Sequence, residues 1–372
     1  MAVVTGTRAE YGLLCSTMEA ARKHRKLDLQ VVVTGMHLLR KFGYTVRDIE
    51  SDGWRIDARI KMQTGEDDPL DQAGGLSHGV AGIAEFLDRA KTDIVVVLGD
   101  RIEAMAGALA AVTTGRFLAH IHGGDLAPGD VDDSLRHAVT KLAHLHFPAT
   151  KSARRRILRL GESPDRVHWV GAPGLDRLRT LIKQAHKPAK RTDGALIVQH
   201  PSGRSAEREY RVMRNILRTV EEAGLERTII YPNSDRGHQG VIAAIEEHRK
   251  RFTSGDVRIV RSLDRDAYLR TLLNAKVLVG NSSGGIIESA TAGTPAVNVG
   301  SRQQGRERSG RSVIDADESL GSIRSALATA LKKRPITGGR SVYGDGGAGA
   351  RIAQHLAAMP LDDAFRRKIN AF

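Results

Sequence analysis

The sequence repeats one unit along most of its length: a short apolar run, a glycine-rich or polar loop, and an amphipathic segment at helical spacing. The apolar runs are Ala2–Thr5, Leu29–Val33, Asp93–Leu98, Phe117–Ile121, Leu145–Phe147, Val167–Val170, Ala195–Gln199, Thr228–Tyr231, Val257–Val260, Val277–Val279 and Ala296–Val299. Strands that alternate with helices form parallel sheets covered on both faces. The pattern therefore predicts an α/β protein with doubly wound, Rossmann-like sheets.

The length of 372 residues is too great for one ordinary hydrophobic core. Residues 182–193 are polar, contain a proline and lack an apolar period, which is typical of a linker. We therefore predict an N-terminal domain at 1–181 and a C-terminal domain at 194–352, followed by a helical segment at 353–372 that packs back on the N-terminal domain. Because such sheets bind ligands beyond the carboxyl ends of their strands, we expect the domains to face each other across a cleft.

Composition narrows the class of function. The formal net charge is +14, but aromatic residues make up only 4% of the chain and no nucleic-acid-binding motif is present. A basic surface that steers an anionic substrate explains this charge better than nucleic-acid binding. No apolar run approaches the ~20 residues that span a membrane, and a strand-like run begins at once, so we expect no signal peptide and no membrane association. The single cysteine, Cys15, suits a cytoplasmic protein.

The segment after Val277–Val279 carries the clearest binding signal. Small residues, including Ser282 and Ser283, separate this strand from a helical pattern. Glycines allow close approach of a ligand, and N–H groups at a helix start lack partners, so this arrangement favours a phosphate or diphosphate site. An ordinary serine-capped turn is the alternative. Glu288 lies one turn into the helix, where it would accept hydrogen bonds from ribose hydroxyls, and Arg302 indicates an anion.

The loop after the first strand contains Arg8 between Thr7 and Glu10. The spacing of Thr7 and Glu10 is that of a capping box, which explains those two residues without any ligand. It does not explain Arg8, whose guanidinium would be repelled by the helix dipole unless an anion were present. We therefore expect Arg8 to bind a phosphate or another part of the substrate.

Acidic residues and histidines gather at strand ends in the first half of the chain. The residues that we select as catalytic candidates are Asp100, His122, Asp125 and Asp132. A role as helix N-cap would explain Asp100 or Asp132 alone, but not four such residues at the strand ends of one domain. Arg101, beside Asp100, is a candidate for substrate binding. The His-Ile-His alternation at 120–122 allows a zinc site, yet no further His or Cys motif supports it, so we prefer acid–base chemistry without a metal.

Two further strand ends in the second half carry polar side chains. His200 and Asn233 are candidates for contacts with a diphosphate or sugar, or simply turn residues. The glycine pattern at Gly344–Gly349 matches a dinucleotide fingerprint in its letters, but no convincing strand precedes it. We therefore reject NAD, expect no cofactor, and expect the glycines to cap the helix Ala350–Leu356.

Taken together, these motifs resemble the hydrolysing UDP-N-acetylglucosamine 2-epimerase family, and most strongly its sialic-acid-type branch. The matching segments run in order through nearly the whole chain: TGTRAEYGLL, VVVTGMHL, LGDRIEA, HIHGGD, DDSLRHAVTKLAHLHF, VGAPGLD, QHP, YPNSD and NSSGG with SRQQGRERSG. The resemblance implies the two-domain, GT-B-like fold shared with many glycosyltransferases and a UDP-sugar substrate. We also expect a homo-oligomer, a dimer or a tetramer.

The family activity is elimination of UDP across C1–C2 of the sugar, followed by hydration of the glycal to the manno-configured N-acetyl sugar. The matching positions imply that the nucleotide is held by Ser282, Ser283, Glu288 and Arg302. They also place Arg8, His200 and Asn233 along the diphosphate and sugar, and make Asp100 and Asp132 acid–base candidates. Cationic side chains and a helix dipole would stabilise the leaving UDP, so no metal is needed.

One position departs from the family pattern. Some members carry glutamate in an H-I-E-G-G motif, where this chain has His122. The departure leaves two sugars open, UDP-N-acetylglucosamine and the 2,4-diacetamido-trideoxy sugar of the bacillosamine-type epimerases. Two other classes of protein also remain as alternatives: a glycosyltransferase of the same fold, and a nucleotide-sugar sensor without turnover.

Overall fold

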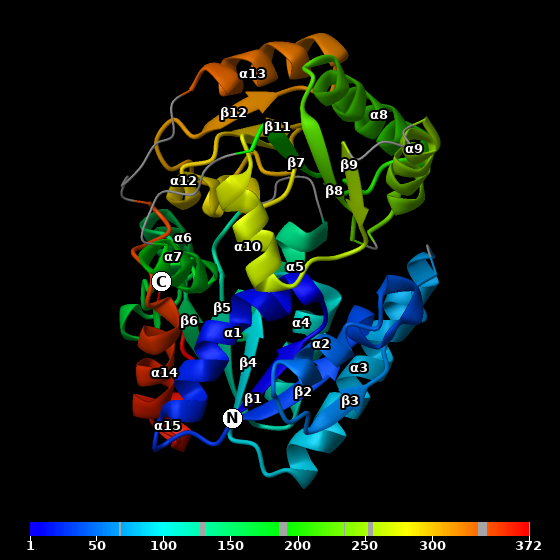
Figure 1. Cartoon of the computed structure of the whole chain (residues 1–372). Helices are drawn as coiled ribbons and strands as arrows, with labels where there is room; N and C mark the ends of the chain where they lie inside the picture. Colours follow the sequence, from blue (N-terminus) through cyan, green and yellow to red (C-terminus); the bar gives the residue numbers. More distant parts are fainter. Residues whose placement is uncertain are drawn as a thin grey trace. The chain divides into compact units, whose positions relative to one another are not determined.

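The computed structural model describes residues 1–66, 68–126, 131–185, 192–233, 235–251, 256–333 and 341–371, and the chain forms two compact units (Figure 1). Unit 1 comprises Met1–Asp176 and Tyr343–Phe372, and unit 2 comprises Arg177–Val342. The predicted domain limits stay predictions. Residues 186–191 of the predicted linker lie outside the described residues.

Unit 1 contains a six-stranded parallel sheet in the order β3-β2-β1-β4-β5-β6. Its strands are β1 (Ala2–Thr5), β2 (Gln30–Thr34), β3 (Ala58–Ile60), β4 (Ile94–Leu98), β5 (Phe117–Ile121) and β6 (Leu145–Phe147). Its helices are α1 (Arg8–Lys23), α2 (Val46–Ser51), α3 (Pro69–Arg89), α4 (Ile102–Thr113), α5 (Val131–Leu142), α6 (Lys151–Arg159), α14 (Ala348–Ala358) and α15 (Asp363–Arg366), with 3-10 turns η1 (Gly35–Leu38), η2 (Arg40–Phe42) and η3 (Pro164–Arg166). The boundary between the units falls within α7 (Gly174–Gln184).

Unit 2 contains a second six-stranded parallel sheet in the order β12-β11-β10-β7-β8-β9. Its strands are β7 (Gly194–Val198), β8 (Glu226–Ile230), β9 (Val257–Val260), β10 (Val277–Gly280), β11 (Ala296–Val299) and β12 (Val313–Ala316). Its helices are α8 (Ala206–Glu222), α9 (His238–Arg251), α10 (Arg265–Asn274), α11 (Gly284–Ile287), α12 (Ser289–Ala292) and α13 (Leu320–Lys332).

The predicted fold class, two doubly wound α/β sheets, is confirmed. In each sheet the strand order reverses once, between β1 and β4 in unit 1 and between β7 and β10 in unit 2. Ligands of open parallel sheets bind beyond the carboxyl ends of the strands at such a reversal. The candidate residues of the loops after β1, β4, β7 and β10 are therefore at the expected positions.

The predicted strand at Val167–Val170 is wrong, because Val167 makes an isolated bridge to His146. Two strands escaped prediction, β3 and β12, which both lie at sheet edges. Each is short and carries a charged residue, Arg59 in β3 and Asp315 in β12, so the apolar run is interrupted.

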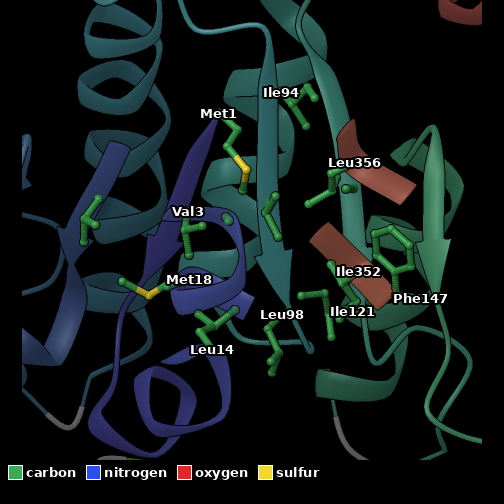
Figure 2. Close-up of a cluster of buried hydrophobic side chains, with 14 of the residues drawn as sticks. Met1, Val3, Leu14, Met18, Ile94, Leu98, Ile121, Phe147, Ile352 and Leu356 are labelled. Carbon is green, nitrogen blue, oxygen red and sulfur yellow. The ribbon is translucent and has the colours of Figure 1, made fainter. Parts of the chain in front are cut away.

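A cluster of buried apolar side chains lies on one face of the unit 1 sheet. Figure 2 shows side chains from the strands and from α1 meeting Ile352 and Leu356 of α14 in this cluster. Helix α14 approaches α1 so closely that a Cβ at Gly349 would lie 2.5 Å from the backbone carbon of Ser16. The C-terminal part of the chain thus completes the core of unit 1.

The glycine pattern at Gly344–Gly349 leads into α14, in agreement with its predicted capping role. The Asp176 carboxylate accepts hydrogen bonds from the backbone N–H groups of Gly347 (2.7 Å), Ala348 (3.0 Å) and Gly349 (2.8 Å). A carboxylate of the protein therefore binds the start of this helix, where a dinucleotide site would bind a phosphate. Within the described ranges, no helix is long and apolar enough to cross a membrane.

Candidate active site

Asp100 follows β4 and forms an ion pair with Arg136 of α5. The N-cap position of α4 belongs to Arg101, so the capping explanation for Asp100 is wrong. The Arg136 side chain is 2% exposed, and its Nη1 donates a hydrogen bond to the backbone oxygen of Asp125 at 3.1 Å. The same nitrogen lies 3.7 Å from a carboxylate oxygen of Asp133. Arg136 therefore joins the ends of β4 and β5 to the first two turns of α5.

His122 follows β5 with a backbone φ of +63°, in the left-handed region. Non-glycine residues adopt this region at a cost, and such residues cluster at functional sites. The buried ring places Nδ1 3.5 Å from Oδ2 of Asp125, and Nε2 is buried without a hydrogen-bond partner among the described residues. The candidates His122 and Asp125 are thus in contact and close to Arg136.

His120 has a structural role. Its ring is fully buried, with Nε2 2.7 Å from the Gly99 backbone oxygen and Nδ1 3.2 Å from the Thr140 hydroxyl. Burial lowers the pKa of His120 to about 3, so the ring is neutral at neutral pH. The predicted alternation of His120 and His122 also ends with β5 at Ile121. Of the side chains that the structure describes, no three His, Cys, Asp or Glu residues form a group that would hold a metal ion.

Asp132 lies in the first turn of α5 and is partly buried. It is one turn of helix away from Arg136, so Asp132 and Arg136 lie on the same face of α5. Three of the four catalytic candidates, Asp100, His122 and Asp125, are brought together by contacts, and Asp132 is placed on the helix that joins them.

Arg8 and Arg101 lie at the ends of β1 and β4. We expected an anion beside Arg8, and the carboxylate of Asp48 in α2 lies there: its Oδ2 is 2.9 Å from Nη1 of Arg8. Thr7 is the N-cap of α1 as predicted, and its hydroxyl accepts a hydrogen bond from the Glu10 N–H at 3.3 Å. The Glu10 carboxylate accepts hydrogen bonds from the backbone N–H groups of Gly6 and Thr7, which agrees with the predicted capping box. The Nε atom of Arg101 lies 3.4 Å from a carboxylate oxygen of Glu103.

In unit 2, Asn281 joins the ends of β7 and β10. Its side chain accepts a hydrogen bond from the His200 N–H (2.7 Å) and donates one to the His200 backbone oxygen (2.8 Å). Nδ1 of His200 accepts a hydrogen bond from the backbone N–H of Asn233 at 3.1 Å. A neutral imidazole that accepts at Nδ1 carries its proton on Nε2. The two predicted candidates, His200 and Asn233, are therefore in direct contact.

The loop with Ser282 and Ser283 leads into two short helices, α11 and α12, in place of the single predicted helix. The Ser282 hydroxyl accepts a hydrogen bond from the Gly284 N–H at 3.3 Å, and Ser283 occupies the N-cap position of α11. A Cβ at Gly284 would lie 2.1 Å from the hydroxyl oxygen of Tyr268, so only glycine fits here.

Glu288 lies between α11 and α12 and is 3% exposed. It forms an ion pair with Arg265, and it contributes with burial to a pKa of Tyr268 well above the usual value. Arg265 and Tyr268 are thus its partners in the protein, where the sequence suggested ribose hydroxyls alone.

Arg302 follows β11 and lies 3.8 Å from the carboxylate of Asp235. The same carboxylate accepts a hydrogen bond from the Asn233 side chain at 2.5 Å. Through Asp235, Arg302 is therefore connected to Asn233 and His200.

Sequence reasoning missed the partners of the predicted residues, namely Arg136, Glu103, Asp235, Arg265 and Tyr268. Arg136 had a usable signal, since it follows Asp132 by four positions in a helical segment and so lies on the same helix face. Glu103 and Asp235 are near neighbours of Arg101 and Asn233 in the sequence, but their spacing of two residues is not a contact pattern that the sequence analysis used. Arg265 and Tyr268 come from α10, and local spacing carries no information on their contact with Glu288.

Comparison with known proteins places the chain in a family. A family profile described as UDP-N-acetylglucosamine 2-epimerase matches residues 19–357. The chain is 35% identical to UDP-N,N'-diacetylbacillosamine 2-epimerase (hydrolyzing) of Legionella pneumophila, with 99% of this chain and 98% of the relative covered. It is 30% identical to UDP-N-acetylglucosamine 2-epimerase of Neisseria meningitidis, with 88% and 86% covered.

The fold also matches that of a solved structure, Methanocaldococcus jannaschii UDP-GlcNAc 2-epimerase in complex with UDP-GlcNAc and UDP. The TM-score is 0.75 at 18% identity, and the match covers 96% of this chain and 99% of that one. This structural similarity supports the fold alone. The family profile and the sequence identities support membership of the family. The chain therefore belongs to the UDP-N-acetylglucosamine 2-epimerase family.

Proposed function

We propose that this protein is a hydrolysing UDP-N-acetylglucosamine 2-epimerase, which converts UDP-N-acetylglucosamine and water into N-acetylmannosamine and UDP. Family membership makes the chain a UDP-sugar 2-epimerase, and the proposal adds the sugar and the hydrolytic outcome. The observation that carries it is the Asp100–Arg136 ion pair, since Arg136 also fixes Asp125 beside His122. Acid–base groups are thereby held at the strand reversal of unit 1.

The reaction needs several proton transfers. In the elimination, a base removes the proton from C2 while the C1–O bond to UDP breaks, which leaves a C1=C2 glycal. In the hydration, water adds its oxygen to C1 and gives up a proton, and an acid delivers a proton to the opposite face of C2. The C2–H bond beside an N-acetyl group is weakly acidic, so both steps require positioned groups. Asp100, His122, Asp125 and Asp132 are the candidates for these roles.

The nucleotide and its diphosphate require cations and hydrogen-bond donors. In unit 2, Ser282, Ser283, Glu288 and Arg302 are proposed to hold UDP, with His200 and Asn233 beside the diphosphate and sugar. In unit 1, Arg8 and Arg101 are proposed to contact the anionic part of the substrate. Guanidinium groups stabilise a leaving diphosphate directly.

The test is incubation with UDP-N-acetylglucosamine, without any acceptor, in deuterated water and under NMR observation. We expect equal amounts of UDP and N-acetylmannosamine, with deuterium at C2 of the sugar. UDP release that requires an added acceptor would indicate a glycosyltransferase. Binding of the UDP-sugar without turnover would indicate a sensor.

A second candidate substrate is UDP-N,N'-diacetylbacillosamine. It is favoured by the higher identity and coverage of the Legionella pneumophila relative, 35% over 99% of this chain against 30% over 88% for the Neisseria meningitidis relative. The same NMR assay with both UDP-sugars decides between them by the ratio of kcat/KM values.

A homo-oligomeric state, dimer or tetramer, and a cytoplasmic location also belong to this proposal. Light scattering on the purified protein tests the first, and fractionation of the source cells tests the second.

A further inference from the structure

Glu103 is a fully buried carboxylate in the first turn of α4, two residues after Arg101. Its Oε1 accepts a hydrogen bond from the Gln63 side chain at 3.0 Å, and its Oε2 lies 3.4 Å from Nε of Arg101. A buried carboxylate is costly unless it is paired and hydrogen-bonded. The remainder of α4 is mostly alanine and other apolar residues, so packing alone does not account for a glutamate here.

Two glycines make room for the Glu103 side chain. A Cβ at Gly6, after β1, would lie 2.3 Å from Cγ of Glu103, and a Cβ at Gly35, after β2, would lie 2.4 Å from its Oε1. The carboxylate therefore lies against the loops that follow β1 and β2 while it faces Arg101 after β4. One side chain connects three strand ends around the strand reversal of unit 1.

The protonation of the neighbouring carboxyl group of Glu10 also supports the pairing of Glu103 with Arg101. Glu10 is a second buried carboxyl group nearby, and it accepts a hydrogen bond from the Gly6 N–H at 2.9 Å. Burial, together with the charge of Glu103, raises the pKa of Glu10 to about 8. Glu10 is therefore mostly neutral at pH 7, and Glu103 is the carboxyl group of this cluster that lies against Arg101.

We propose that Glu103 is a positioning residue, which orients Arg101 so that its guanidinium binds the anionic part of the UDP-sugar. Arg101 directly follows the catalytic candidate Asp100, and its side chain is 19% exposed, so a ligand reaches it. A guanidinium has five N–H donors in a fixed plane, so contact with Glu103 on one edge sets the direction of the others. This inference rests on the proposed function, because it assumes an anionic sugar nucleotide as the substrate.

The test is a double-mutant cycle with Arg101→Ala, Glu103→Gln and the double variant, each assayed for kcat and KM with the preferred UDP-sugar. Glutamine keeps the volume of Glu103 and an oxygen that accepts from Gln63, but it removes the charge. If Glu103 acts through Arg101, we expect each single change to raise KM about tenfold. The double variant should then resemble Arg101→Ala alone, since interacting residues are non-additive.

Glu162→Gln is the matched control. Glu162 is also a buried carboxylate of unit 1, and it pairs with Lys141, His146 and Lys368. Its loss should lower the melting temperature and combine additively with Arg101→Ala. If Glu103→Gln folds poorly, Gln63→Leu takes its place, because it removes the hydrogen bond that holds the Glu103 carboxylate and should also be non-additive with Arg101→Ala.

Additive effects of Glu103→Gln and Arg101→Ala on KM, in an active enzyme, would overturn the positioning role and leave the proposed function intact. A fall in kcat with unchanged KM would also overturn it. Wild-type protein that turns over neither UDP-sugar would refute the proposed function, and the inference with it.

Discussion

The guanidinium of Arg136 forms an ion pair with the Asp100 carboxylate, and its Nη1 donates a hydrogen bond to the backbone oxygen of Asp125. One buried side chain of α5 thus holds the residues that follow two neighbouring strands, β4 and β5. Because both strands end at the same edge of the sheet, a change in this ion pair should affect both stability and chemistry.

We expect Asp100→Asn to lower turnover by about 10²-fold or more, the typical loss for a general acid or base. It should also destabilise the protein by about 1–3 kcal/mol, because Arg136 loses a charged partner. Calorimetric UDP affinity should hardly change. Asp133→Asn is the control, since Asp133 lies 3.7 Å from the same guanidinium on α5. Equal losses of turnover in both variants would remove the special role of Asp100.

The sequence predicted those structural features that depend on a local pattern of residues. Continuous apolar runs predicted β1, β5 and β6 with the observed bounds. The carboxyl ends of parallel strands share one edge of a sheet, so Asp100 and His122 were predictably close together. Contacts of Arg136 with Asp100, and of Arg265 with Glu288, depend on how helices pack on the sheet. Residue spacing along the chain does not encode that packing.

The nucleotide site should respond differently to two substitutions. Arg302→Ala should weaken UDP binding about tenfold with little loss of stability, because its contact with Asp235 is long, at 3.8 Å. Glu288→Gln should weaken UDP binding and also lower the melting temperature, because Glu288 is buried against Arg265. Calorimetry with UDP measures the first effect and thermal melting the second.

Arg324→Ala provides the control for loss of a cation in unit 2, because Arg324 forms an exposed ion pair with Glu222. UDP affinity should be unchanged in this variant. If Arg302→Ala and Glu288→Gln also bind UDP like the wild type, the nucleotide site proposed for these residues is wrong.

Activity should survive exhaustive chelation. The proposed mechanism stabilises the leaving diphosphate with guanidinium groups and backbone donors, so it has no step that requires a divalent ion. The measurement is turnover after dialysis against EDTA, compared with turnover after addition of Mg²⁺, Mn²⁺ or Zn²⁺. Loss of activity on chelation with recovery on one of these ions would contradict the proposal.

Glu10 should make stability depend on pH. Burial raises its pKa from 4.5 to about 8, so between these values the folded protein keeps a proton that the unfolded chain has lost. The contribution to stability is therefore complete below pH 4.5 and is lost as the pH rises through 8. Glu10→Gln is neutral at every pH and keeps an acceptor for the Gly6 N–H. The free energy of unfolding of this variant, relative to wild type, should rise from pH 5 to pH 8.

Urea denaturation at pH 5, 6.5 and 8 measures this difference. Glu19→Gln on the same helix is the control, because it removes an exposed carboxyl group where Glu10→Gln removes a buried one. A pH-independent difference for Glu10→Gln would mean that Glu10 titrates alike in the folded and unfolded chains.

His122 has both a strained backbone and a buried ring, and the two contributions are separable. Two variants, His122→Asn and His122→Ala, separate them. At a φ of +63°, asparagine is tolerated better than alanine, so His122→Asn should be more stable than His122→Ala. If the imidazole takes part in acid–base chemistry, both variants should lose about 10²-fold or more in turnover per folded molecule. Lys91→Ala, at a φ of +49° in unit 1, reports the cost of alanine in this backbone region without any change at the site. Variants of His122 that are less stable but fully active would leave Asp100, Asp125 and Asp132 to carry the proton transfers.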